Sequence, residues 1–164
     1  DVAGFSGLRA HSTDADTAMI EIGNNEHGAL IAAAIPRPFD PNNSMVFSRV
    51  TPEGNLMGGV IFDDYTVGCV FMHQAAFHKN WLTGNMIWMV FDYPFNKLRV
   101  NKVAGVVCST NKELLDFNLR LGFKEEARIK DAYADGDMIV LTMERSECRW
   151  LKIKPKVYEK DEAA

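Results

Sequence analysis

The segment from Asn111 to Asp137 constrains the fold more than any other part of the chain, because a helix, a stop, a strand and a turn follow one another without a gap. Asn111 is a good N-cap, and the apolar residues after it give a helix with a broad apolar face: Leu114, Leu115, Phe117, Leu119 and Leu121. Gly122 predicts the end of that helix, and Phe123 begins a strand that reaches an Asp-Gly turn. The segment therefore predicts a helix followed by a strand hairpin.

The rest of the chain predicts further strands and helices with loops between them. Proline is disfavoured in helix interiors, so Pro94 predicts a kink or an early end in the helix that contains it. The predicted elements are a strand at 19–22, a helix from Asn24 or Asn25 to Ala34, an antiparallel meander at 44–50, 56–62 and 67–75, a buried helix at 84–97, a strand at 99–109, the helix at 112–121, and a hairpin at 123–132 and 137–144.

Residues spaced along the second half of the chain resemble the GCN5-related N-acetyltransferases. That superfamily shows HRV, about eight residues, N, about ten residues, LGF, and then EG or EA. The matching residues here are Asn101, Lys102 and Val103, then Asn111, then Leu121, Gly122 and Phe123, then Glu126 and Ala127. Within the superfamily the chain resembles the small acetyltransferase-like proteins of tailed phages and prophages, through the segments 80–95, 136–143 and 144–151.

The resemblance implies an α/β (α+β) fold with a central mixed, mostly antiparallel sheet. In that fold helices flank the sheet, and its fourth and fifth strands splay apart. We expect the acetyltransferase-like domain to span residues 18–151. Residues 1–17 lack a sustained period and are interpreted as a leader or a cloning remnant, and residues 152–164 are interpreted as a loose charged tail.

The resemblance also implies a site for acetyl-CoA, with the pantetheine arm between the splayed strands 67–75 and 99–109. The pyrophosphate is expected at a loop and the helix N-terminus that follows it, where unpaired N–H groups and the helix dipole both favour an anion. The residues expected to bind the cofactor are His73, Gln74, Ala75, His78, Lys79, Asn80, Trp81, Leu82, Thr83, Gly84 and Asn111. Asn111 has a second interpretation, as a helix cap alone.

The loop at 78–84 departs from the superfamily pattern, because Trp81 and Thr83 stand where small residues are usual. Glycine lets backbone amides approach a phosphate closely, so Trp81 must turn outward or block that approach. Thr83 can still cap the helix, and Lys79 can supply positive charge. The departure leaves open that Trp81 plugs a cleft that no longer binds the cofactor.

The catalytic residues are less well defined by the sequence. Asn118 stands where many members carry a tyrosine, and an amide cannot serve as a general acid. His73 is the best candidate for a general base, because an imidazole titrates near neutral pH. It also fits a packed strand residue. Asp63 and Asp64 suit the recognition of an amine, although a surface turn explains them as well.

Composition limits the partners. A net charge of -4 argues against a broad phosphate-binding face, so nucleic acid is not expected. Three separated cysteines, without a CxxC or Cys/His cluster, fit reduced packing residues in the cytoplasm and predict no metal site. The chain has no run of about 18 apolar residues, so no membrane segment is expected.

Two functions follow from the sequence. The first is an acetyl-CoA-dependent N-acetyltransferase acting on the primary amine of a small molecule or peptide. The second is a non-catalytic phage protein with the same fold, a virion or host-interaction component that binds CoA as a structural ligand or not at all. The pattern leaves a homodimer open.

Overall fold

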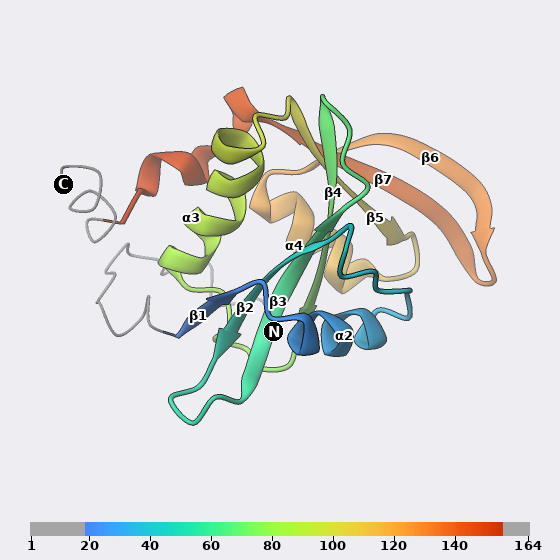
Figure 1. The fold of residues 1–164 in the computed structure, drawn as a ribbon. Coiled ribbons are helices and arrows are strands. Elements are labelled where there is room, and N and C mark those ends of the chain that lie inside the picture. Colours follow the sequence, from blue (N-terminus) through green and yellow to red (C-terminus); the bar gives the residue numbers. More distant parts are fainter. Residues whose placement is uncertain (1–18, 156–164) are drawn as a thin grey trace.

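The fold is described from a computed structural model, for residues 19–155. Within this range seven strands form one sheet, in the order β1-β2-β3-β4-β5-β7-β6 (Figure 1). Neighbouring strands are antiparallel except β4 and β5, which are parallel. The strands are β1 (Ile20–Ile22), β2 (Met45–Val50), β3 (Leu56–Asp63), β4 (Cys69–Ala76), β5 (Lys102–Cys108), β6 (Lys124–Tyr133) and β7 (Gly136–Glu144). The sheet is the mixed, mostly antiparallel one that was predicted.

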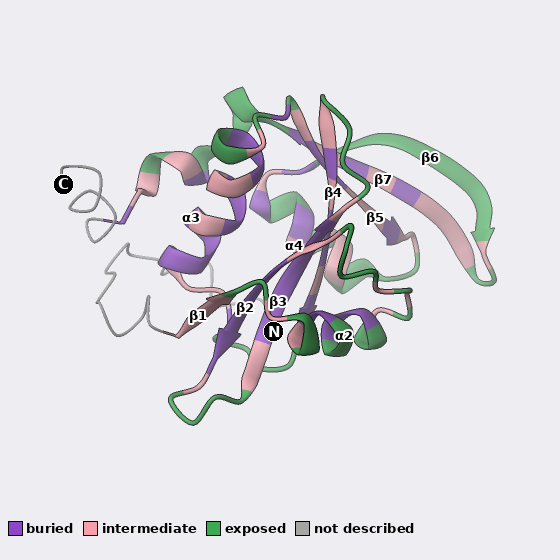
Figure 2. Ribbon diagram, viewed as in Figure 1, coloured by how far each residue is buried: buried purple, intermediate pink, exposed green. Residues whose placement is uncertain are grey.

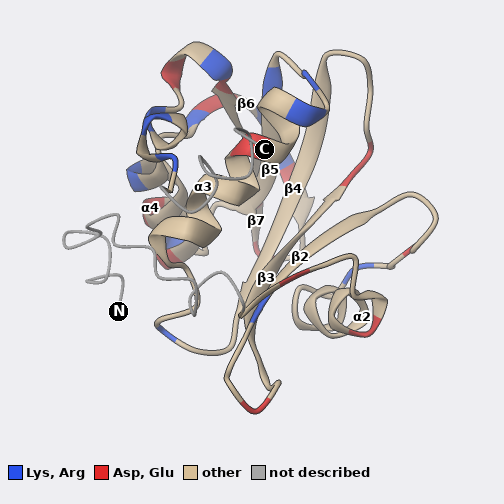
Figure 3. Cartoon of the chain, turned by 60° about the vertical axis from the view of Figure 1, so that its left-hand side comes forward, with Lys and Arg blue, Asp and Glu red and all other residues tan. Residues whose placement is uncertain are grey.

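In residues 19–155 three α-helices cover the two faces of the sheet, with α2 on one face and α3 and α4 on the other (Figure 3). They are α2 (Asn25–Ala34), α3 (Gly84–Asp92) and α4 (Lys112–Leu121). Strand side chains alternate between the faces, so Phe62 packs in the large core beneath α3 and α4, whereas Ile61 packs in a smaller core beneath α2. No helix of the described range is long and apolar enough to cross a membrane.

The predicted caps are formed by side chains. Asn24, Thr83 and Asn111 each accept a hydrogen bond from the backbone N–H three residues on. Gly122 ends α4 with φ at 112°, a left-handed conformation that glycine adopts without steric cost. Pro94 gives the predicted early end, because α3 stops at Asp92 and the chain continues as a π-helical turn over Tyr93–Lys97.

The hairpin of β6 and β7 extends the sheet beyond the helices. β6 is exposed along nearly its whole length, whereas β3 is largely buried (Figure 2). β6 also contains the bulge at Glu125 and Ala127, where its register against β7 shifts by one residue. β6 therefore adds little to the core, whereas β7 contributes Ile139, Leu141 and Met143 to it.

The chain packs back onto the domain after β7. Two short 3-10 helices, Arg145–Glu147 and Arg149–Ile153, follow that strand. Trp150 is buried, and its indole Nε1 donates to Leu121 O at 2.8 Å. Ile153 packs against the large core, although it lies in the predicted tail. Residues 1–18 and 156–164 lie outside the described residues, so the predicted leader and domain boundaries remain predictions.

Candidate functional site

β4 and β5 begin as a parallel pair and then separate. They pair at three positions only, Cys69 with Lys102, Val70 with Val103 and Phe71 with Ala104, although both strands continue for several residues. β4 keeps its pairing with β3 up to Ala76. The splay predicted between the fourth and fifth strands is therefore present, and it opens toward the carboxyl ends of both.

Backbone groups of β4 point into this opening. Alternate residues of a strand direct their N–H and C=O to opposite neighbours. Lys102 N donates to Gly68 O at 3.0 Å, so the backbone of Gly68 faces β5. The backbone groups of Met72 and Gln74, which lie an even number of residues further along the strand, face the same way. Phe77 N donates to Met57 O at 2.8 Å, so the backbone groups of the odd-numbered residues of β4 face β3. Of the three β4 residues predicted to bind the cofactor, Gln74 alone therefore offers its backbone to the opening, while His73 and Ala75 face β3.

Gly105 lies on β5 where the two strands part. A Cβ built on it would lie 3.4 Å from Met72 O. It would point to the same face as Val103 and Val107, which pack beneath α3 and α4. The missing side chain leaves room beside the unpaired backbone of β4.

The loop predicted to hold phosphate lies at this open end, because it follows β4 and ends at the Thr83 cap of α3. Its first residues are already bonded to one another: Asn80 N donates to His78 Nδ1 at 3.1 Å, and Trp81 N donates to His78 O at 3.3 Å. His78, Lys79 and Asn80 are exposed. Two of the amides expected to meet phosphate are therefore used inside the loop.

Trp81 turns inward and belongs to the large core, with 5% of its surface exposed. It lies over Gly58 of β3, where a Cβ would come within 2.7 Å of the indole Cγ. Tryptophan at a small-residue position is thus accommodated by a glycine on the neighbouring strand. Leu82 is half-buried against the same core.

A buried arginine lies beside this loop. Arg49 of β2 is 7% exposed, and its Nη1 donates to Thr83 Oγ1 at 3.2 Å. Arg49 lies two residues from Phe47 on the same strand, so both side chains lie on the same face of the sheet. Phe47 packs in the large core, and the Arg49 side chain therefore points inward. A charged residue at an inward position of an alternating strand is a signal that the sequence analysis did not use.

His73 lies on the opposite face of the sheet, beneath α2, where it forms a cluster with two charged residues. Its Nε2 is 2.7 Å from Asp63 Oδ1, and its Nδ1 is 2.9 Å from Arg37 Nη1. Arg37 Nη2 also donates to Asp63 Oδ2 at 2.8 Å. His73 is 8% exposed, and the Asp63 side chain is 12% exposed. His73 lies two residues beyond Phe71, the last residue of β4 paired with β5, so the cluster borders the splay.

The partners of His73 fix its protonation state in this arrangement. A guanidinium only donates hydrogen bonds, so Nδ1 must accept from Arg37. Nε2 then carries the proton and donates to the Asp63 carboxylate. His73 is thus a neutral imidazole with both nitrogens engaged. Sequence reasoning had considered His73 and Asp63 separately, but it missed Arg37, which lies in a proline-rich loop without a recognisable motif.

The residue at the position that carries tyrosine in many acetyltransferases makes structural hydrogen bonds in this chain. Asn118 is 8% exposed, its Nδ2 donates to Leu114 O at 2.9 Å, and its Oδ1 accepts from Gln74 Nε2 at 3.4 Å. The amide pair therefore bridges β4 and α4. Asn111 is exposed and caps α4 through Leu114 N at 3.2 Å, so its cap role is confirmed, whereas a ligand role stays a prediction.

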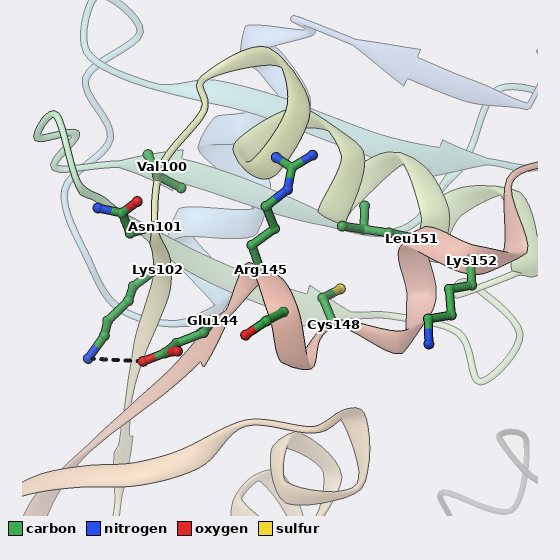
Figure 4. Close-up of a pocket in the computed structure, with 9 residues that line it drawn as sticks. Val100, Asn101, Lys102, Glu144, Arg145, Cys148, Leu151 and Lys152 are labelled. Carbon is green, nitrogen blue, oxygen red and sulfur yellow. Dashed lines mark ion pairs between the residues drawn. The ribbon is translucent and has the colours of Figure 1, made fainter.

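A separate open depression of about 590 Å³ lies at the closed end of the β4 and β5 pair (Figure 4). Lys102 faces Glu144 there at 3.9 Å, and a hydrogen bond to Glu126 raises the pKa of Lys102. Arg145 points toward the π-helical turn, where it donates to Phe95 O and Asn96 Oδ1. Burial raises the pKa of the Cys148 thiol, so it stays protonated near neutral pH. No group of three metal-binding side chains occurs in residues 19–155.

Several solved structures of N-acetyltransferases share this fold. A point mutant of the Vibrio cholerae spermidine N-acetyltransferase matches with 18% identity and a TM-score of 0.57, covering 67% of this chain and 69% of that one. A second point mutant of that enzyme matches with 15% identity and a TM-score of 0.60, covering 82% and 97%. The ribosomal-protein-S5-alanine acetyltransferase of Vibrio fischeri matches with 14% identity and a TM-score of 0.55, covering 66% and 65%.

A scan against protein-family models found no match, and neither did a search of curated protein sequences. At such low sequence identities, the structural similarity shows only that the fold is shared. The chain has the fold of the GCN5-related N-acetyltransferases, as the sequence resemblance predicted.

Proposed function

We propose that the protein is an acetyl-CoA-dependent N-acetyltransferase that acts on a primary amine. The observation that carries the proposal is the limited pairing of β4 and β5, which ends after Phe71 and Ala104 and leaves β4 backbone groups turned toward the gap. The fold shared with spermidine and alanine acetyltransferases supports the reaction class. Amino acids, polyamines, protein N-termini and small-molecule drugs all remain candidate acceptors.

The residues at the splay fit a pantetheine arm. Met72 and Gln74 offer backbone groups, and Gly105 leaves space beside them. The buried charge of Arg49 and the N-terminus of α3 both favour an anion, which suits the pyrophosphate. The loop at 78–84 fits less well because His78 already takes two of its amides.

Bound acetyl-CoA would supply the acetyl group as a thioester. The amine nitrogen would form the new C–N bond, the C–S bond would break, and the thiolate would take up a proton. In this proposal His73 accepts the proton that the substrate ammonium loses, and the Asp63 carboxylate balances the resulting imidazolium. His73 Nδ1 is the nitrogen that must become available, so Arg37 has to move first.

The second candidate is a non-catalytic phage protein with the same fold, a virion or host-interaction component that binds CoA as a structural ligand or not at all. Two observations favour it: Trp81 is part of the core where a small residue is usual, and Asn118 is tied to Leu114 and Gln74 where tyrosine is usual. Calorimetric titration with CoA tests the cofactor site. A turnover assay with acetyl-CoA and a panel of primary amines then separates an enzyme from a binding protein. Absence of CoA binding would contradict the enzyme and leave the non-catalytic protein as the remaining candidate.

Filling the opening should weaken CoA binding. Gly105→Val adds a side chain where β4 and β5 part, so we expect the Kd for CoA to rise by about tenfold or more, equivalent to roughly 1.4 kcal/mol. Gly68→Val is the matched control, because Gly68 lies at the closed end and its nearest contact for a Cβ is Asn101 at 3.5 Å. Equal loss of affinity in both variants would argue against binding in the splay.

Lys79 should make a modest contribution to CoA binding. It is exposed in the loop before α3, where a charge interacts with phosphate through solvent. Lys79→Ala is expected to raise the Kd for CoA by about tenfold or less, with the larger part of the loss at low salt. Titration at two salt concentrations measures this. Complete loss of binding would mean that the lysine charge, rather than backbone donors and the helix N-terminus, holds the phosphates.

A further inference from the structure

The cluster beneath α2 holds a cation between a carboxylate and an imidazole nitrogen. Arg37 Nη2 donates to Asp63 Oδ2 at 2.8 Å, and Arg37 Nη1 lies 2.9 Å from His73 Nδ1. A primary ammonium ion needs the same two partners, a carboxylate that balances its charge and a nitrogen that accepts its proton. The arginine side chain thus occupies a place whose chemistry suits an amine.

The arginine is not fully satisfied in this place. Its Nε is buried without a hydrogen-bond partner, and leaving a buried donor unpaired is unfavourable. Its side chain is 27% exposed, so part of it already reaches solvent. Arg37 N donates to Ala32 O at 3.1 Å, which anchors the backbone at the end of α2. The side chain can therefore leave while the loop stays in place.

The two groups it holds are fixed more firmly. Asp63 and His73 lie on adjacent strands, two rungs apart in the β3 and β4 register, and both are largely buried. The His73 ring also stacks on Phe71, with ring centroids 6.4 Å apart. The carboxylate and the imidazole thus form a rigid pair, whereas the guanidinium comes from a loop.

We propose that Asp63 and His73 form a binding site for a primary ammonium cation, and that Arg37 occupies this site as an internal cation until an acceptor displaces it. The proposal rests on the proposed function and deepens it, because it makes the acceptor enter as a cation. Displacement frees His73 Nδ1 to take one proton from the ammonium, which leaves a neutral amine and an imidazolium facing Asp63.

The site can be tested without any catalytic assay. Arg37→Ala removes the internal cation, so methylammonium or guanidinium chloride at low millimolar concentration should fill the space. At a concentration near ten times its Kd, either salt should raise the Tm of this variant by about 2–5 °C, compared with the same concentration of sodium chloride. Tetramethylammonium, which has no N–H donor, should have no such effect. Wild-type protein should respond by less than about 1 °C, because its own arginine competes.

Two control variants test whether the Tm response is specific to the proposed site. Arg120→Ala removes an exposed arginine on α4, far from this face, and should respond like the wild type. Arg37→Ala combined with Asp63→Asn should lose the response, because the carboxylate is gone. The proposal is overturned if Arg37→Ala melts cooperatively and shows no specific response, or if the double variant responds equally.

A second measurement covers the case in which Arg37→Ala does not fold. Long-range ¹H–¹⁵N spectra of the wild-type protein report which His73 nitrogen carries the proton. A proton on Nε2 and none on Nδ1 supports the arrangement, and a proton on Nδ1 refutes it.

Kinetics then connect the site to acetyl transfer. Arg37→Ala should lower the KM for a primary amine by about tenfold, because the amine no longer displaces a resident cation. An unchanged or higher KM overturns the role in acceptor binding. If no variant acetylates any amine but methylammonium still stabilises Arg37→Ala, the cation site stands and only the enzymatic function fails.

Discussion

His73→Ala is expected to lower kcat for acetyl transfer by about two to four orders of magnitude, the usual contribution of a general base. The reason is geometric, since His73 borders the point where β4 and β5 part and lies against the Asp63 carboxylate at 2.7 Å. The Kd for CoA should stay nearly unchanged, because the His73 side chain lies beneath α2, on the face opposite Gln74 and α4. Single-turnover rates and a CoA titration on the same preparation measure both quantities.

His27→Ala is the matched control for this prediction. His27 is also a partly buried histidine on the α2 face, with Nδ1 at 2.8 Å from Ser48 Oγ, but it lies outside the proposed site. Its replacement should leave kcat within about twofold, while it removes a similar packed ring. A comparable rate loss in the two variants, or a small loss in His73→Ala, would remove His73 as the base. A water molecule or the Asp63 carboxylate would then be the better candidate.

Local patterns were enough to predict most of the fold. The Asn111 cap, the apolar face of α4 and the Gly122 stop depend on neighbouring residues, so that helix was predicted with the bounds it has. β4 and β5 are neighbours although they lie far apart in sequence, and the resemblance to a known superfamily supplied that adjacency. Physical patterning alone would have left the partner of β4 open.

The site was predictable only in part, because its groups meet through the tertiary structure. Asp63 and His73 were visible as candidates, but Arg37 reaches them from a loop after α2, and no spacing rule connects the three. The inward direction of Trp81 depends on Gly58, a residue of another strand. The sequence therefore predicted where the strands part better than the side-chain contacts around that opening.

Trp81→Ala is expected to lower the free energy of unfolding by about 3–5 kcal/mol, as for other buried large aromatic residues. Trp81 is 5% exposed and packs in the large core over Gly58, so its removal leaves a cavity above β3. Urea denaturation measures the loss. Trp81→Phe is the control, because a ring is kept over Gly58 and the loss should fall below about 1.5 kcal/mol.

A substitution at Gly58, on β3 beneath Trp81, tests the same contact more directly. Gly58→Ala should destabilise the wild-type protein, because its Cβ would lie 2.7 Å from the Trp81 Cγ. In the Trp81→Ala background the added methyl group meets a cavity, so the same change should be nearly neutral or favourable. A double-mutant cycle then gives a coupling of about 0.5–3 kcal/mol for residues in contact. Independent effects of the two changes, together with tighter CoA binding in Trp81→Ala, would mean that Trp81 blocks the cofactor site instead of supporting the core.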